Sequence, residues 1–94
     1  MRQTEFIPVF VEEIPEEIEE GKLYISRKYE TAIHLCACGC GQQSVTSFKA
    51  GRWQLFENSN GTVSLDRSIG NFSDEKPKYH AHYYIKNNKV IWAK

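Results

Sequence analysis

All three cysteines of the chain fall within five residues of one another. Cys36, Cys38 and Cys40 alternate with Ala37 and Gly39. Alternate side chains of an extended segment point to one side of it, and a bend at a glycine could close the three thiols around an ion. Cysteines this close along the chain are poorly placed to form disulfides with one another. The spacing therefore indicates a metal site rather than a disulfide framework.

A second group of potential ligands lies far downstream, where His80 and His82 alternate along the chain. Structural zinc takes four cysteine or histidine ligands with no open position, and soft thiolates suit it. We expect zinc to be held by Cys38, Cys40 and His82, with Cys36 and His80 competing for the fourth place. Both histidines could face the ion, or one could bind it while the other donates a hydrogen bond to a ligand.

Other roles for these side chains stay open at the level of sequence. Free cysteine commonly serves as a small reduced core residue. A redox-active pair usually has two cysteines separated by two residues at the start of a helix, a pattern that is missing here. We expect His34, just before the cysteines, to be a surface or half-buried imidazole, although it too could complete the metal site.

Length and composition describe a small folded protein. At 94 residues the chain is expected to form one domain, residues 1–94, whose modest core would gain stability from a bound metal. The apolar stretch 6–11 is interrupted by Pro8 and is too short for a signal peptide, and no segment approaches the length of a transmembrane helix. Clustered free thiols are typical of a reducing compartment, so we expect a cytoplasmic protein with no membrane contact.

The charges cancel overall but are unevenly distributed. Residues 1–20 contain one arginine and seven glutamates, a net charge of −6, while the remainder carries eleven basic and five acidic residues, a net charge of +6. The acidic run is expected to be a solvated surface segment near a mildly basic sheet. Exposed tyrosines could stack on a single-stranded nucleic acid, but the chain has no basic stripe to follow its phosphates. Nucleic acid is therefore not the favoured partner.

The hydrophobic pattern predicts a mainly β protein with at most one short helix. Strands are expected over residues 5–11, 22–26, 31–36 and 44–48, where β-branched and aromatic residues gather, with Pro8 marking an edge or irregular strand. Pro15, the glutamates that follow it and Gly21 are typical of a single helical turn over residues 15–21.

Two antiparallel hairpins complete the predicted fold. Residues 53–57 and 62–66 flank a loop in which Gly61 adopts a left-handed conformation, so that Leu55 lies opposite Leu65. Residues 82–86 and 89–93 flank two asparagines that tolerate positive φ, which pairs Tyr83 with Trp92. In that register, His82 does not share the face that carries Trp92.

Familiar catalytic motifs are missing from the sequence. It has no His-Glu-x-x-His motif, no phosphate-binding glycine-rich loop, and no His-x-Glu paired with Pro-Cys-x-x-Cys. Asp66, close to Ser68, is better explained by a turn at a strand end. The sequence favours a binding protein over an enzyme. The alternative is a zinc-dependent hydrolase in which three protein ligands leave a position for water, although no general base is evident.

In their order, these motifs resemble those of a small bacterial family of unknown function. The resemblance rests on residues 21–26, 34–41, 52–53, 63–65, 68–69, 82–85 and 90–92. Family members pair a Cys-x-Cys-Gly-Cys-Gly turn with a closing Cys-x-Ser-His-Tyr/Phe hairpin, and their genes often lie beside ubiquitin-like conjugation genes. The resemblance implies a metal-binding β domain that serves as an accessory or partner protein, and it implies no particular chemistry.

The chain departs from that family pattern in the closing hairpin. Tyr79 stands where the pattern has cysteine, three residues before His82, and His80 is the nearest substitute ligand. We therefore predict a small cytoplasmic β domain of short antiparallel hairpins, held by one structural zinc ion and acting through an unidentified protein partner. The sequence does not identify a small-molecule substrate.

Overall fold

The part of the chain that the structure describes contains eight β-strands. The computed structural model describes residues 4–49, 52–73 and 76–93, and within these ranges it gives the backbone alone for residues 71–73 and 76–81. None of the described residues forms a helix, so this part of the chain offers none that could cross a membrane. The strands are β1 (Ile7–Phe10), β2 (Lys22–Ser26), β3 (Thr31–Leu35), β4 (Gln43–Ser47), β5 (Leu55–Glu57), β6 (Val63–Ser73), β7 (Lys76–Lys86) and β8 (Lys89–Trp92).

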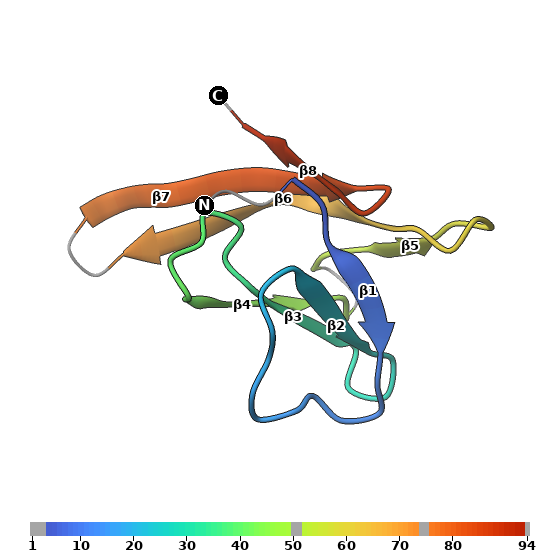
Figure 1. The fold of residues 1–94 in the computed structure, drawn as a ribbon. Coiled ribbons are helices and arrows are strands. Elements are labelled where there is room, and N and C mark those ends of the chain that lie inside the picture. The colour runs from blue at the N-terminus through green and yellow to red at the C-terminus, as the bar shows by residue number, and fades with distance from the viewer. Residues whose placement is uncertain (1–3, 50–51, 74–75, 94) are drawn as a thin grey trace.

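The strands form two four-stranded sheets, and the chain completes one before it begins the other. The first has the order β1-β2-β3-β4 and the second the order β5-β6-β7-β8. Figure 1 shows the second sheet lying above the first, with β6 and β7 as its longest strands at 11 residues each. Within each sheet, consecutive strands are neighbours, as expected when short connections dominate. The predicted fold class, mainly β with antiparallel hairpins, is confirmed.

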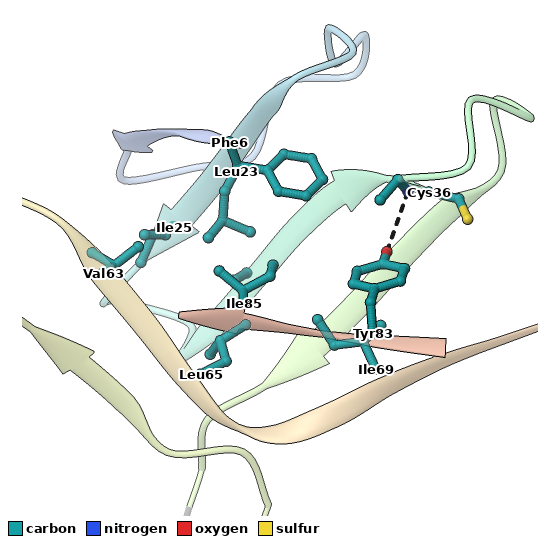
Figure 2. Close-up of a cluster of buried hydrophobic side chains, with 11 residues drawn as sticks. Phe6, Leu23, Ile25, Cys36, Val63, Leu65, Ile69, Tyr83 and Ile85 are labelled. Carbon is teal, nitrogen blue, oxygen red and sulfur yellow. Dashed lines mark hydrogen bonds between the residues drawn. The ribbon is translucent and has the colours of Figure 1, made fainter. Parts of the chain in front are cut away.

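The core fills the space between the two sheets. Phe6, Leu23 and Ile25 from the first half of the chain meet Leu65 and Ile85 from the second, as Figure 2 shows. Burying one such side chain contributes roughly 1.5–3 kcal/mol. Because both sheets supply these side chains, neither sheet has a complete core by itself. The buried cluster comprises Phe6, Leu23, Ile25, Ala32, Cys36, Ala37, Val63, Leu65, Ile69, Tyr83 and Ile85.

The predicted hairpin registers agree with the structure, but β6 and β7 extend well beyond the predicted ranges 62–66 and 82–86 because the two strands also pair with each other. Residues 22–26 form β2 as expected, and β3 and β4 differ from their predicted ranges by one residue at their ends. Leu55 pairs with Leu65, and Gly61 has a φ of +88°. Tyr83 pairs with Trp92 across a turn of two asparagines with φ values of 52° and 69°. Alternation and turn chemistry were sufficient to fix both hairpins.

The sequence did not reveal that β1 runs parallel to β2. Ile7 pairs with Lys22 and Phe10 with Ile25. The strand was expected and is confirmed, but parallel pairing requires a crossover, which here is the glutamate-rich segment 11–21.

The helical turn predicted over residues 15–21 is wrong. A segment this short gains too few hydrogen bonds to offset the cost of nucleating a helix, and its four neighbouring glutamates repel one another. The Glu19 N–H instead donates to the Tyr24 hydroxyl at 3.1 Å. Gly21, with a φ of 87°, then turns the chain into β2.

Asn88, at the tip of the β7–β8 hairpin, joins three parts of the fold. Its carbonyl accepts the Phe6 N–H at 2.7 Å. Its own N–H donates to the Val63 carbonyl at 2.8 Å, and its side-chain oxygen accepts the Val63 N–H at 2.7 Å. The N-terminal segment is held further by the Val90 N–H, which donates to the Thr4 carbonyl at 2.9 Å. These bonds attach the first described residues to the last hairpin.

Candidate functional site

The three cysteines lie in a tight turn between β3 and β4. The turn is closed by the Cys36 N–H, which donates to the Gln42 carbonyl at 2.7 Å, and by the Gly39 N–H, which donates to the Cys36 carbonyl at 3.0 Å. Gly39 and Gly41 have φ values of 90° and 84°, which glycine adopts without the strain that other residues would incur. The two glycines therefore allow the chain to fold back and bring the thiols together.

The geometry of the thiols suits a metal ion. All three Sγ atoms lie within 4.8 Å of one another, and those of Cys36 and Cys38 are 3.4 Å apart. Zinc–sulfur bonds of about 2.3 Å in a tetrahedron place sulfurs about 3.8 Å apart, which is close to this spacing. Cys36 is buried, Cys38 is half-buried and Cys40 is exposed. The three thiols would thus bind one side of a metal ion, and the cluster is open to solvent at Cys40.

The thiols influence one another's ionisation. Burial, followed by hydrogen bonds with the Cys40 and Cys36 thiols, raises the pKa of Cys38 to about 12. Burial also opposes ionisation of Cys40, but hydrogen bonds from the Gln42 backbone and from the Cys38 and Cys36 thiols outweigh it and lower the pKa of Cys40. Cys40 therefore releases its proton more readily than Cys38, and a thiolate is the form that binds metal.

The candidate histidine ligands are placed differently from the cysteines. His82 pairs with Gly70, and its ring centroid lies 6.2 Å from that of Tyr84, on the face of β7 opposite Tyr83. Among the described side chains, the group that could hold an ion contains Cys36, Cys38 and Cys40, without His82. The side chain of His80 lies outside the described residues.

His34 differs from the expected surface or half-buried imidazole, because it is completely buried. Its Nε2 lies 2.6 Å from the Tyr83 hydroxyl, and its ring packs edge-on against Phe6 at a centroid distance of 4.9 Å. Its Nδ1 has no hydrogen-bond partner among the described residues. Burial lowers the pKa of His34 to about 4, so the ring is neutral at pH 7.

Tyr83 connects this histidine to the cysteine turn. Its hydroxyl also accepts the Ala37 N–H at 3.3 Å, and Figure 2 shows the ring reaching from β7 to the turn. This hydrogen bond was not predicted from the sequence. His34 and Tyr83 are 49 positions apart, and the contact becomes visible only when the two sheets are placed together.

Ser44 lies directly opposite His34 in the β3–β4 pair, and both are buried. Ser44 also lines an open cavity of about 210 Å³ beside β4, together with Trp53, Ile69 and Gly70. Sequence reasoning missed this pairing, since the two residues are ten positions apart on either side of the cysteine turn. The register of the β3–β4 hairpin was the signal that could have found it.

These features define a small two-sheet β domain with a cluster of free thiols beside a buried histidine, a serine and a tyrosine. The sequence model of one protein family, described as bacterial ubiquitination-like system serine protease (BubE), matches residues 10–93. The match covers nearly the whole chain, and the chain belongs to this family. The predicted relationship to a bacterial family linked to ubiquitin-like conjugation is thereby confirmed. Neither the curated proteins nor the solved structures include a match to the chain.

The family's description makes a second departure in the closing motif important. The pattern Cys-x-Ser-His-Tyr/Phe aligns with Tyr79, His80, Ala81, His82 and Tyr83. The chain thus has alanine where the pattern has serine, in addition to tyrosine where it has cysteine.

Proposed function

We propose that the chain acts on the ubiquitin-like protein of a bacterial ubiquitination-like system, as a small serine peptidase whose domain, residues 1–94, is held together by one zinc ion. The observation that carries this proposal is the family match over residues 10–93. We place the protein in the cytoplasm, because a reducing compartment would keep its three clustered thiols free to bind metal.

Ser44 is the nucleophile that the geometry supports best. A serine nucleophile needs a neighbouring base to take its proton, and that base is usually oriented by a third group. Ser44 lines a cavity opposite His34, whose neutral imidazole can accept a proton and whose ring is oriented by the Tyr83 hydroxyl. Burial also makes His34 a weak base, so we expect slow turnover.

Zinc in this proposal is structural. The thiolates of Cys36, Cys38 and Cys40 would supply three ligands, with a histidine from the pair His80 and His82 as the fourth. A bound zinc ion would fix the turn that carries Ala37, whose N–H bonds to Tyr83. If the fourth position were instead open to water, the site would have the form of a zinc hydrolase, and the peptidase activity would then not depend on Ser44.

The test is cleavage of the ubiquitin-like protein of the same bacterial ubiquitination-like system, extended at its C-terminus by a short peptide and followed by mass spectrometry. The zinc-loaded chain should remove the extension, and Ser44→Ala should reduce the rate at least tenfold. Ser47→Ala, in the same strand, is the matched control and should retain the rate. Cleavage that survives in Ser44→Ala would exclude this nucleophile.

A second candidate function is binding without hydrolysis, the accessory role expected from the sequence. The observation that favours it is Ala81, which lacks the hydroxyl present in the family pattern. In that case the chain would bind the ubiquitin-like protein and leave the extension intact, while Ala81→Ser would gain cleavage. Cleavage by the unmodified chain would dismiss this candidate.

A further inference from the structure

β4 forms one edge of the first sheet, and half of its backbone is unpaired. Within the described ranges, β3 is its one sheet neighbour. The Cys36 N–H donates to the Gln42 carbonyl, and the Phe48 N–H donates to the Glu30 carbonyl. These two bonds identify the opposite residues of β3 and β4 that are hydrogen-bonded to each other. In antiparallel strands, hydrogen-bonded pairs alternate with pairs that are not hydrogen-bonded. The backbone groups of Ser44 and Thr46 therefore bond to β3.

Gln43 and Val45 therefore direct their N–H and C=O groups away from the sheet. No hydrogen bond to these groups occurs among the described residues, whereas the next carbonyl, that of Ser47, already accepts the Trp53 N–H at 3.0 Å. The side chain of Val45 is 58 % exposed. Two donors and two acceptors, repeating every second residue, are thus open at the surface.

The remaining edges are less available. Pro8 leaves β1 without one of its outward N–H groups. The edge of β8 is occupied at Val90, whose N–H donates to the Thr4 carbonyl. β5 is only three residues long, and its Glu57 is ion-paired with Arg27 in the turn between β2 and β3. At five residues, β4 is the longest of the four edge strands.

A cavity adjoins this same edge. It has a volume of about 210 Å³, and its lining includes Gln43, Ser44, Val45 and Trp53. A chain laid along β4 would therefore pair its backbone with Gln43 and Val45 and bring a side chain to the cavity. Groups that repeat about every 6.8 Å along a strand are matched by another extended polypeptide backbone.

We propose that β4 is a docking strand, which an extended segment of a protein partner joins as a fifth strand of the first sheet. The identity of that segment rests on the proposed function, and we take it to be the stretch of the ubiquitin-like protein that the peptidase acts on. Strand addition would hold this segment in one extended conformation beside Ser44. The partner is recognised mainly through its backbone, so the sequence of the segment would matter only where a side chain enters the cavity.

Amide hydrogen exchange on the zinc-loaded full chain tests this assignment. The probe is the ubiquitin-like protein of the same bacterial ubiquitination-like system, carrying a C-terminal peptide extension. In the free chain the Gln43 and Val45 amides should exchange quickly, whereas those of Ser44 and Thr46, bonded to β3, should exchange slowly. Adding the probe should slow exchange at Gln43 and Val45 at least tenfold.

Val45→Pro gives an independent test, because proline removes the outward N–H without removing a bond between β3 and β4. Its affinity for the probe should fall at least tenfold, while Val45→Thr, which keeps the N–H, should bind within threefold of the unmodified chain. If Val45→Pro fails to fold or to hold metal, the hydrogen-exchange data alone test whether β4 is the docking strand.

The outcomes separate this proposal from the function on which it rests. Binding of the probe with protection away from Gln43 and Val45, or unchanged affinity in Val45→Pro, would overturn the docking strand alone. If the unmodified chain neither binds nor cleaves the probe, the proposed function itself fails.

Discussion

At the scale of single residues, Tyr83 has the largest structural role around the cysteine turn. Its side chain is completely buried, and one hydroxyl contacts both the His34 ring and the backbone of Ala37. Because these partners are themselves buried, removing the hydroxyl leaves them without this contact in an apolar environment. A buried polar group that loses its partner costs more than an ordinary hydrogen bond contributes.

We expect Tyr83→Phe to lower the free energy of unfolding by about 1–3 kcal/mol, the cost of leaving a buried donor or acceptor unsatisfied. Urea denaturation would measure it as a lower midpoint with an unchanged slope. Tyr84→Phe is the matched control, since Tyr84 is 42 % exposed on the opposite face, and it should change stability by less than about 0.5 kcal/mol. Equal effects in both variants would mean that the hydroxyl of Tyr83 contributes nothing specific.

The two candidate histidine ligands can be distinguished by substitution. His82 lies on the face of β7 opposite Tyr83, which is the side chain that reaches the cysteine turn. The register shifts between the Asn71–Ala81 and Phe72–Tyr79 pairs, so strand alternation from His82 does not fix the position of His80.

We therefore expect His80→Ala to lose zinc, with affinity reduced at least tenfold, and His82→Ala to retain it. Elemental mass spectrometry of each purified variant beside Cys38→Ser would measure this. Loss of zinc in His82→Ala alone would reverse the assignment. Full zinc content in Cys38→Ser would show that the thiols are not the ligands of the metal.

The sequence identified the residue types of this site but not all of its contacts. The three thiols at alternate positions are recognisable in the sequence because these candidate metal ligands lie within a few residues of one another. The contact between His34 and Tyr83 is not local, and it depends on how one sheet packs on the other. Burial of His34 followed from that packing, which explains why the expectation of a half-buried ring failed.

At the scale of elements, the β7–β8 hairpin determines how the rest of the chain is attached. Asn88 combines a φ of 69° with hydrogen bonds to Val63 and Phe6, so the turn residue serves both the hairpin and its neighbours. Positive φ costs a residue other than glycine about 1–2 kcal/mol, and asparagine is among those that tolerate it best.

Substitutions at Asn88 should separate these two contributions. Asn88→Gly keeps the backbone conformation but loses the side-chain bond to Val63, so it should cost about 1 kcal/mol. Asn88→Ala loses that bond and also strains the turn, so it should cost about 2–3 kcal/mol. Thermal or urea unfolding of both variants would measure the difference. Equal losses would show that the backbone conformation at this position is not a source of strain.

Elements were predictable where the signal was local. Turn residues and alternation were enough for both hairpins, down to the pairing of Leu55 with Leu65 and of Tyr83 with Trp92. The parallel pairing of β1 with β2 was not predictable, because no turn joins the two strands directly. The segment between them has local helix signals, but the hydrogen bond from the Glu19 N–H to Tyr24 competes with the helical conformation.

At the scale of the whole molecule, stability is expected to depend on the metal. The buried cluster contains 11 residues and is shared between two small sheets, so each interaction is a large fraction of the total. Metal binding that occurs only in the folded state adds its free energy to folding.

Removing zinc with a chelator at neutral pH should therefore lower the melting temperature by ~10 °C or more, since about 1 kcal/mol corresponds to 4–8 °C in a domain of this size. Differential scanning calorimetry before and after dialysis would measure the shift. Cys38→Ser should already melt at the lower temperature and should not respond to the chelator. An identical melting temperature with and without chelator would show that metal does not hold the fold together.

The attachment of the N-terminal segment to Asn88 and Val90 has a consequence for synthesis of the protein. Phe6 enters the core and pairs with Asn88, which the ribosome adds more than eighty residues later. Pairing across so long a stretch of chain cannot begin until the final hairpin has left the ribosomal exit tunnel, and contacts of such large sequence separation form slowly. Throughout elongation the apolar N-terminal segment of the nascent chain must therefore stay unpaired until the last hairpin completes the fold.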